Sequence, residues 1–253
     1  MSRFLFGIAL LILVLVTALS SAQNYCDPEL CPSGTHVACQ SSGRFVSGCS
    51  GEFVQVDPHI PLILQQHNER RNLIAGGGVS GFPSAVQMAT MAWDATLAQL
   101  AAYNALQCRM AHDECRNTNT YRYAGQNLSI LFTRSVDVAV FLRQRIAAWF
   151  DENRYANSGD IESYQSRGGP AIGHFTTMVN ERNNRVGCAI ARFTDANNVQ
   201  ATLLVCNYAV TNVLNNPVYR AGPAASECTT GRNSNYPNLC SPNEVYNYNQ
   251  WSG

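Results

Sequence analysis

Five histidines and ten cysteines are the residues of this chain that could carry chemistry beyond packing. The cysteine count is even and every cysteine follows residue 22, so all can pair and no free catalytic thiol is expected. His112 and His174 lie too far apart in the sequence for any metal-ligand spacing rule to detect them. Ser129 and Ser163 lack the G-x-S-x-G context of a hydrolase nucleophile. The residue types alone therefore leave open whether the histidines bind a metal or only make hydrogen bonds.

The first 22 residues have the pattern of a secretory signal peptide. Arg3 precedes an apolar run at 4–16, and small residues precede a cleavage point after Ala22. The run is shorter than the roughly 20 apolar residues that cross a bilayer, and no later segment approaches that length. We therefore expect a secreted, extracellular protein without a membrane span, whose cysteines oxidise to disulfides.

The charge is balanced, with 17 basic residues, all of them Arg, and 17 acidic residues among 253. Proteins that bind nucleic acid normally carry a clustered excess of Lys and Arg, so no nucleic-acid partner is expected. A hydrophobic fraction of 46% is sufficient for a folded core. We expect a monomer that needs no cofactor to fold.

Three stretches predict helices because apolar residues recur in them at helical spacing. They cover about 58–75, 94–108 and 135–149, and Asp94 and Ser135 are the expected N-caps of the second and third. The apolar stripe of the third helix could line a channel for a lipid, although such a stripe usually packs in the core.

Three later runs, at 175–179, 186–193 and 199–206, are rich in β-branched and aromatic residues and predict an antiparallel meander. This hairpin geometry would place Cys188 beside Cys206. Helices followed by a small antiparallel sheet indicate an α+β fold.

Composition divides the chain into four parts. A signal peptide (1–22) precedes a Cys-rich extension without regular period (23–57), then one main domain (58–214) and a tail (215–253). The tail is rich in Pro, Gly, Asn and Tyr, which predicts an irregular segment on the surface.

Five motifs, in order along the main domain, resemble the signatures of the CAP (SCP/TAPS) superfamily. They are His-Asn-Glu-Arg at 67–70, Trp-Asp at 93–94, Gly-Gln-Asn-Leu at 125–128, Gly-His-Phe-Thr-Thr-Met-Val at 173–179 and Leu-Val-Cys-Asn-Tyr at 204–208. The Cys-rich start with Gly-Thr-His at 34–36, the run at 107–115, and the stretches at 212–214 and 217–219 resemble the insect antigen five, or venom allergen, branch, best its fly members.

This resemblance implies an α-β-α sandwich with a small antiparallel sheet, in a disulfide-rich protein of venom, saliva or body fluid. It implies four disulfides and leaves the last two cysteines for a fifth. The pairs are Cys26–Cys39, Cys31–Cys115, Cys49–Cys108, Cys188–Cys206 and Cys228–Cys240. His67 is expected to tie the first helix to its neighbours, and the sequon at Asn127 is expected to be buried and unmodified.

Many CAP proteins have a cleft with two histidines and two acidic residues. Carried over by motif, these positions are His112, His174, Glu152 and Gln126, so the fourth departs from the family pattern although Gln is usual in the antigen five branch. Two imidazoles can hold Zn²⁺ or another divalent metal, with water completing the coordination. An amide cannot ionise, and Gln126 therefore weakens the case for a catalytic site.

The favoured function is non-enzymatic binding of a small hydrophobic ligand or of a secreted host or self protein, with allergenicity in a vertebrate host. One alternative is a metal-dependent hydrolase or redox enzyme that uses the two-histidine cleft. Another is a scaffold with a vestigial cleft that acts through its terminal extensions.

Overall fold

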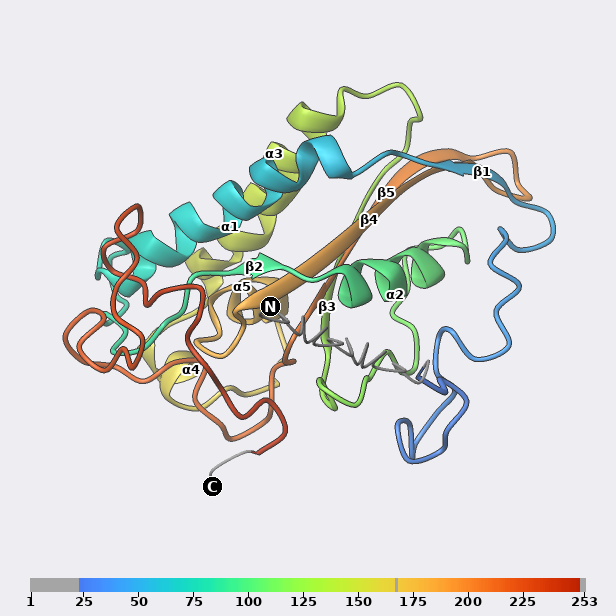
Figure 1. Cartoon of the computed structure of the whole chain (residues 1–253). Coiled ribbons are helices and arrows are strands. Elements are labelled where there is room, and N and C mark those ends of the chain that lie inside the picture. Colours follow the sequence, from blue (N-terminus) through green and yellow to red (C-terminus); the bar gives the residue numbers. More distant parts are fainter. Residues whose placement is uncertain (1–22, 167, 251–253) are drawn as a thin grey trace, which may run out of the picture.

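A sheet of five strands lies between two layers of helices in the computed structural model, which describes residues 23–166 and 168–250 (Figure 1). The strand order is β1-β4-β5-β3, all neighbours along this path are antiparallel, and β2 pairs with β4 in parallel. The signal peptide predicted at 1–22 falls outside the described residues. The strands are β1 Ser50–Phe53, β2 Ala92–Trp93, β3 Gly125–Leu131, β4 Arg185–Thr194 and β5 Gln200–Tyr208.

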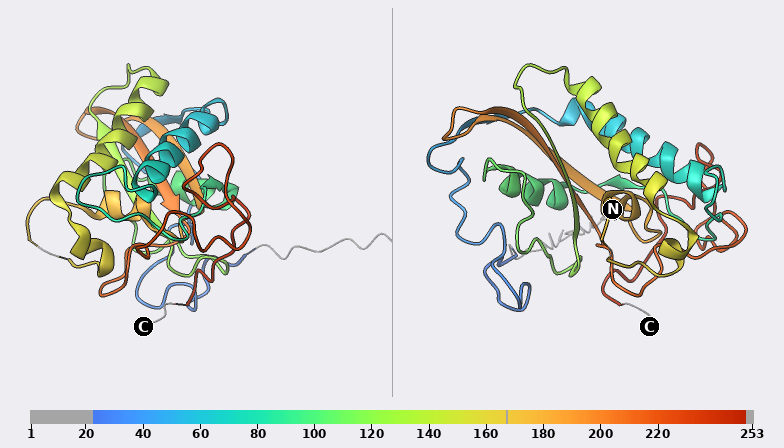
Figure 2. Two further views of the ribbon diagram at one scale, coloured as in Figure 1. Left: turned by 90° about the vertical axis from the view of Figure 1, so that its left-hand side faces the viewer. Right: turned by 180° about the vertical axis from the view of Figure 1, so that it is seen from behind.

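The helices divide between the two faces of the sheet (Figure 2). Helix α2 (Ala95–Ala105) covers one face, and α1 (Ile60–Ala75), α3 (Val138–Phe150) and α5 (Gly173–Val179) cover the other. A short helix α4 (Ser158–Glu162) and two 3₁₀ turns, Asp57–His59 and Asp151–Tyr155, complete the regular elements. The chain is thus an α-β-α sandwich.

Alternation along the two long strands explains the layering. In β4, Cys188 and Ile190 pack in the cluster that contains α1, α3 and α5, whereas Ala189 and Ala191 pack in the cluster under α2. Successive side chains of a strand point to opposite faces, so a strand that is apolar at every position is buried on both. This pattern requires two helical layers rather than one.

One predicted strand is wrong, because residues 175–179 belong to helix α5. Phe175 is fully buried and makes edge contacts with Phe82 and Phe150, with ring centroids 5.5 and 5.6 Å apart. Packing in this core outweighs the β-propensity of the run, which is a weak and context-dependent preference. The third long strand is β3, which pairs with β5 and lies outside the three runs that predict strands.

The three long helices are confirmed, with one change of N-cap. Asp94 caps α2 by accepting a hydrogen bond from the Leu97 backbone N–H at 2.9 Å, as predicted. The cap of α3 is Asp137 rather than Ser135, because the Asp137 carboxylate accepts from the Val140 N–H at 2.8 Å. A carboxylate there also suits the positive end of the helix dipole.

The two ends of the chain are more integrated than the sequence predicts. The extension contributes the edge strand β1 to the sheet, paired with β4. The described part of the tail, 215–250, contains no helix or strand, as expected, but Tyr219 and Leu239 are buried in the main core. The tail is therefore anchored to the main core through these buried side chains, while most of its other residues are exposed or half-buried.

Five disulfides join the cysteines in the pairs that the resemblance implies. Cys188 and Cys206 face each other across β4 and β5. Cys49–Cys108 and Cys31–Cys115 tie the extension to the loop between α2 and β3. Within the described ranges, the structure has no helix that is both long and apolar enough to cross a membrane.

Candidate functional site

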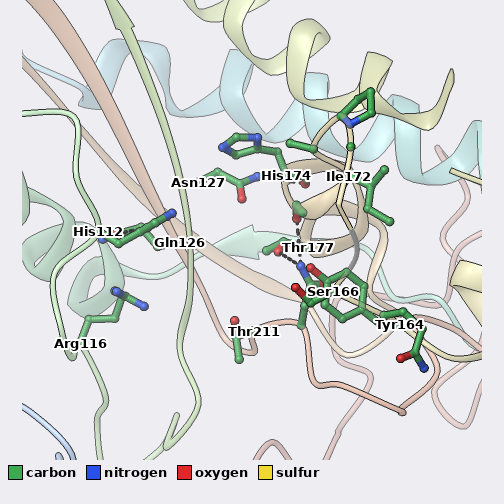
Figure 3. A pocket seen from close by; sticks show the side chains of 16 residues that line it. His112, Arg116, Gln126, Asn127, Tyr164, Ser166, Ile172, His174, Thr177 and Thr211 are labelled. Atoms are coloured by element: carbon green, nitrogen blue, oxygen red, sulfur yellow. Dashed lines mark hydrogen bonds between the residues drawn. The ribbon is translucent and has the colours of Figure 1, made fainter. Parts of the chain in front are cut away.

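An open cleft of about 490 Å³ lies between the α2–β3 loop and α5 (Figure 3). The loop contributes His112 and Arg116, β3 contributes Gln126, and α5 contributes His174. Tyr164, which follows α4, closes the opposite wall. The fold therefore brings the two histidines singled out from the sequence to one cavity.

His174 is held by Glu152, from the 3₁₀ turn after α3. The His174 ring nitrogen Nδ1 lies 2.6 Å from Glu152 Oε1, and Oε2 accepts from the backbone N–H groups of His174 and Phe175 at 2.9 and 3.1 Å. Trp149 stacks on the ring at 6.0 Å between centroids, with an interplanar angle of 15°. Because an ionised carboxylate only accepts, Nδ1 of His174 carries the hydrogen.

His112 is held by Gln126. Its Nδ1 lies 2.8 Å from Gln126 Oε1, and an amide oxygen also only accepts. Nδ1 is therefore the protonated nitrogen of the neutral His112 ring. Within the described ranges, Nε2 of neither histidine has a hydrogen-bond partner.

This arrangement fits a divalent metal in an open site. Metal-binding histidines commonly donate one ring N–H to an oxygen and coordinate through the other nitrogen, which is the state of both rings here. In the described part of the chain, no group of three or more His, Cys, Asp or Glu residues could enclose a metal. The cleft can thus offer two imidazole nitrogens, and water or a ligand atom would complete the coordination. A closed structural zinc site has four protein ligands, so this site would be open.

The two side chains that hold the histidines, Glu152 and Gln126, are fully engaged in hydrogen bonds. Glu152 accepts three hydrogen bonds and orients His174, and it is not among the residues that line the cleft. Gln126 accepts from His112 with its oxygen and donates with its nitrogen to Asp113 and Asn207. Glu152 and Gln126 therefore serve to orient the two histidine rings.

A buried polar network beneath the cleft was only partly predicted. Asn127 donates to the backbone oxygen of His174 at 3.1 Å and to the Tyr208 hydroxyl at 3.3 Å. Tyr208 lies 2.9 Å from His67 Nε2, and His67 Nδ1 lies 2.8 Å from the carbonyl of Ile63. Burial lowers the pKa of His67 to about 4, so this ring is neutral and structural, in keeping with its expected role.

Asn127 is 1% exposed, which places the side chain of the sequon in the interior as expected. The apolar stripe of α3 is also interior. Phe141, Leu142 and Ile146 are fully buried in the main core and Trp149 is 3% exposed. The stripe therefore packs as core instead of lining an open channel.

The sandwich, its five disulfides and the two-histidine cleft define the class of the protein. The model of the CAP family, the Cysteine-rich secretory protein family, matches residues 64–208, and the chain belongs to this family.

Within the family, the chain is similar to venom allergens of the antigen five type. It is 41% identical over 236 residues to Venom allergen-1 of Aedes aegypti, covering 91% of this chain and 92% of the relative. It is 31% identical over 225 residues to Venom allergen 5 of Polistes dominula, covering 84% and 96%. The crystal structure of NaASP2 with Zn²⁺ superposes with a TM-score of 0.59 at 25% identity, covering 78% of this chain and all of that chain. These matches confirm the predicted family and fold.

Proposed function

We propose that this protein is a secreted, non-catalytic binding protein. Its cleft binds a divalent metal ion, preferably Zn²⁺, which is coordinated by His112 and His174. The observation that carries the proposal is that both rings have Nδ1 bonded to an acceptor, which leaves both Nε2 lone pairs available in one cleft. The Zn²⁺ in the NaASP2 structure supports the choice of metal. Five disulfides and the similarity to venom allergens support secretion.

Each residue of the site has a defined part in this function. His112 and His174 donate the lone pairs, Gln126 and Glu152 fix the ring orientations, and Trp149 supports one ring face. A bound Zn²⁺ would supply an electrophilic anchor for an oxygen or nitrogen atom of a ligand in the cleft. The same contacts assign Glu152 and Gln126 to orienting the two rings, so neither side chain is left to serve as a separate general base beside a bound metal.

The test is isothermal titration calorimetry, in which Zn²⁺ is added to the metal-free secreted protein. Native mass spectrometry then counts the bound ions. The wild type is expected to bind one Zn²⁺ per chain, and the H112A/H174A double variant is expected to lose this binding. His59→Ala is the matched control because His59 lies in the turn before α1 and does not line the cleft.

Equal Zn²⁺ binding by the wild type and the double variant would overturn the proposal. Zn²⁺-dependent turnover of ester or peptide substrates that is lost in His174→Ala would favour the enzyme hypothesis instead.

A further inference from the structure

We propose that Asp113 is a positioning residue that fixes which ring nitrogen of His112 faces the cleft. It acts through Gln126 and does not line the cleft itself. The contribution of Asp113 to metal affinity rests on the function proposed above. Its effect on the tautomer of His112 does not depend on a bound metal.

Asp113 has a buried carboxylate at the centre of a hydrogen-bond cluster. Its side chain is 2% exposed. Oδ1 accepts from Arg116 Nε at 2.7 Å, and Oδ2 accepts from Asn104 Nδ2 at 2.7 Å and from Gln126 Nε2 at 2.8 Å. The Arg116 guanidinium compensates the charge and also bonds the backbone oxygens of Asp113 and Ala124, which holds the loop in place.

This cluster leaves only one orientation for the Gln126 amide. Its nitrogen lies between two acceptors, Asp113 Oδ2 at 2.8 Å and Asn207 Oδ1 at 3.0 Å. The Asn207 amide is itself oriented, because its nitrogen donates to the Leu97 carbonyl at 3.2 Å. A reversed Gln126 would point its oxygen at two other oxygens in a buried site, which is strongly unfavourable.

The orientation of Gln126 decides the tautomer of His112. With Oε1 toward the ring at 2.8 Å, Nδ1 must donate and Nε2 keeps its lone pair. Only an unprotonated nitrogen can bind a metal. The buried charge of Asp113 also accounts for Gln at a position where the family pattern has an acid. A second carboxylate at 126 would lie against Asp113 and be repelled.

Replacing Asp113 by Asn tests this directly. The one remaining oxygen would stay with the charged Arg116, so the new NH₂ group would face the amide nitrogens of Gln126 and Asn104. Only Asn207 Oδ1 would then still favour the present Gln126 orientation, and the balance would shift toward the reversed amide. His112 would then meet an N–H donor at Nδ1 and shift to the tautomer protonated at Nε2. The shift is read from long-range ¹H–¹⁵N correlation spectra of histidine-labelled, metal-free protein at alkaline pH, where imidazole is neutral.

The wild type is expected to show His112 protonated at Nδ1, and D113N is expected to shift it toward Nε2. Glu114→Gln is the matched control, since Glu114 is the next residue and bonds the Thr35 N–H at 2.7 Å instead of Gln126. It should leave the tautomer unchanged. Protonation at Nε2 in the wild type, or an unchanged tautomer in folded D113N, would overturn the proposal.

A second variant keeps the proposal testable if D113N folds poorly. Q126E should lower the melting temperature by placing two carboxylates together, and D113N combined with Q126E should recover part of that loss. Absence of any recovery in the double variant would contradict the proposed contact.

The Zn²⁺ titration separates this inference from the proposed function. D113N is expected to weaken Zn²⁺ binding about 10- to 100-fold, as is typical when the group that orients a ligand is changed. If the tautomer shifts as expected but the wild type binds no Zn²⁺, the proposed function fails and the role of Asp113 stands. If Zn²⁺ binds through both histidines and D113N changes neither affinity nor tautomer, the role of Asp113 fails.

Discussion

Glu244→Gln should destabilise the protein more than any substitution of an exposed acid. Glu244 is 2% exposed, and its carboxylate accepts five hydrogen bonds, all of them from uncharged donors. The donors are the backbone and hydroxyl groups of Thr229 and Thr230 and the side chain of Gln87, at 2.6–3.0 Å. This one side chain therefore anchors the C-terminal tail to the segment before β2.

The pKa of Glu244 gives the size of the effect. Burial alone would raise this pKa, but the hydrogen bonds from Thr230, Thr229 and Gln87 outweigh it and lower the pKa from 4.5 to about 2. At about 1.4 kcal/mol per pKa unit, the difference corresponds to about 3 kcal/mol in favour of the folded state with an ionised carboxylate. In the wild type, one carboxylate oxygen accepts from Thr229 and the other from Thr230. A glutamine side chain has only one accepting oxygen, so most of this stabilisation should be lost in E244Q.

The pH dependence follows from the same values. A group with a lowered pKa in the folded state contributes its full stabilisation above its ordinary pKa of 4.5 and loses it as the pH falls toward 2. Urea unfolding at neutral pH should therefore show E244Q less stable by about 3 kcal/mol, and the gap should shrink to about 1 kcal/mol near pH 2.5.

Glu52→Gln is the matched control for Glu244. The Glu52 side chain is 62% exposed and pairs with Arg134 at 3.3 Å, so the change should cost less than about 1 kcal/mol. The reasoning would be refuted if, at neutral pH, E244Q lost less free energy of unfolding than E52Q does. It would also be refuted if the difference between wild type and E244Q did not change with pH.

Three further substitutions test the core and its buried groups. Burial, with a smaller effect from nearby arginines, lowers the pKa of His67 from 6.5 to about 4. Between pH 7 and pH 5 only the unfolded state therefore binds the proton, and the free energy of unfolding should fall by about 2 kcal/mol. Urea titrations should show this pH dependence weakened in His67→Gln. Leu142→Ala should lose about 2–5 kcal/mol in the same assay, because Leu142 is fully buried in the main core. Gly187→Ala should lose about 3 kcal/mol and lower the melting temperature, because the new Cβ would lie 2.1 Å from the backbone nitrogen of Ala98 and 2.3 Å from the backbone oxygen of Asp94. A melting temperature of G187A equal to that of the wild type would contradict the close contact between β4 and α2.

Local patterns predicted the long helices and the β4–β5 hairpin because their signals are short-range. The Asp94 carboxylate accepts a hydrogen bond from the backbone N–H of Leu97, only three residues later. Cys188 faces Cys206 across a single hairpin turn. The stretch at 175–179 was misassigned because its helical form depends on burial against Phe82 and Phe150, which are distant in sequence. Composition cannot report contacts of that kind.

The cleft depended even more on long-range information. His112 and His174 meet only after the fold forms, so motif resemblance was needed to pair them. Asp113 carried no signal of its own, although it directly follows His112, because its role depends on Gln126 and Arg116 reaching the same buried position.

The most direct test of the central claim is a crystal structure of the protein grown with Zn²⁺, with anomalous diffraction measured at the zinc edge. The account predicts one strong peak in the cleft, within about 2.0–2.1 Å of Nε2 of both His112 and His174. An empty cleft, or zinc bound only at other residues, would contradict it.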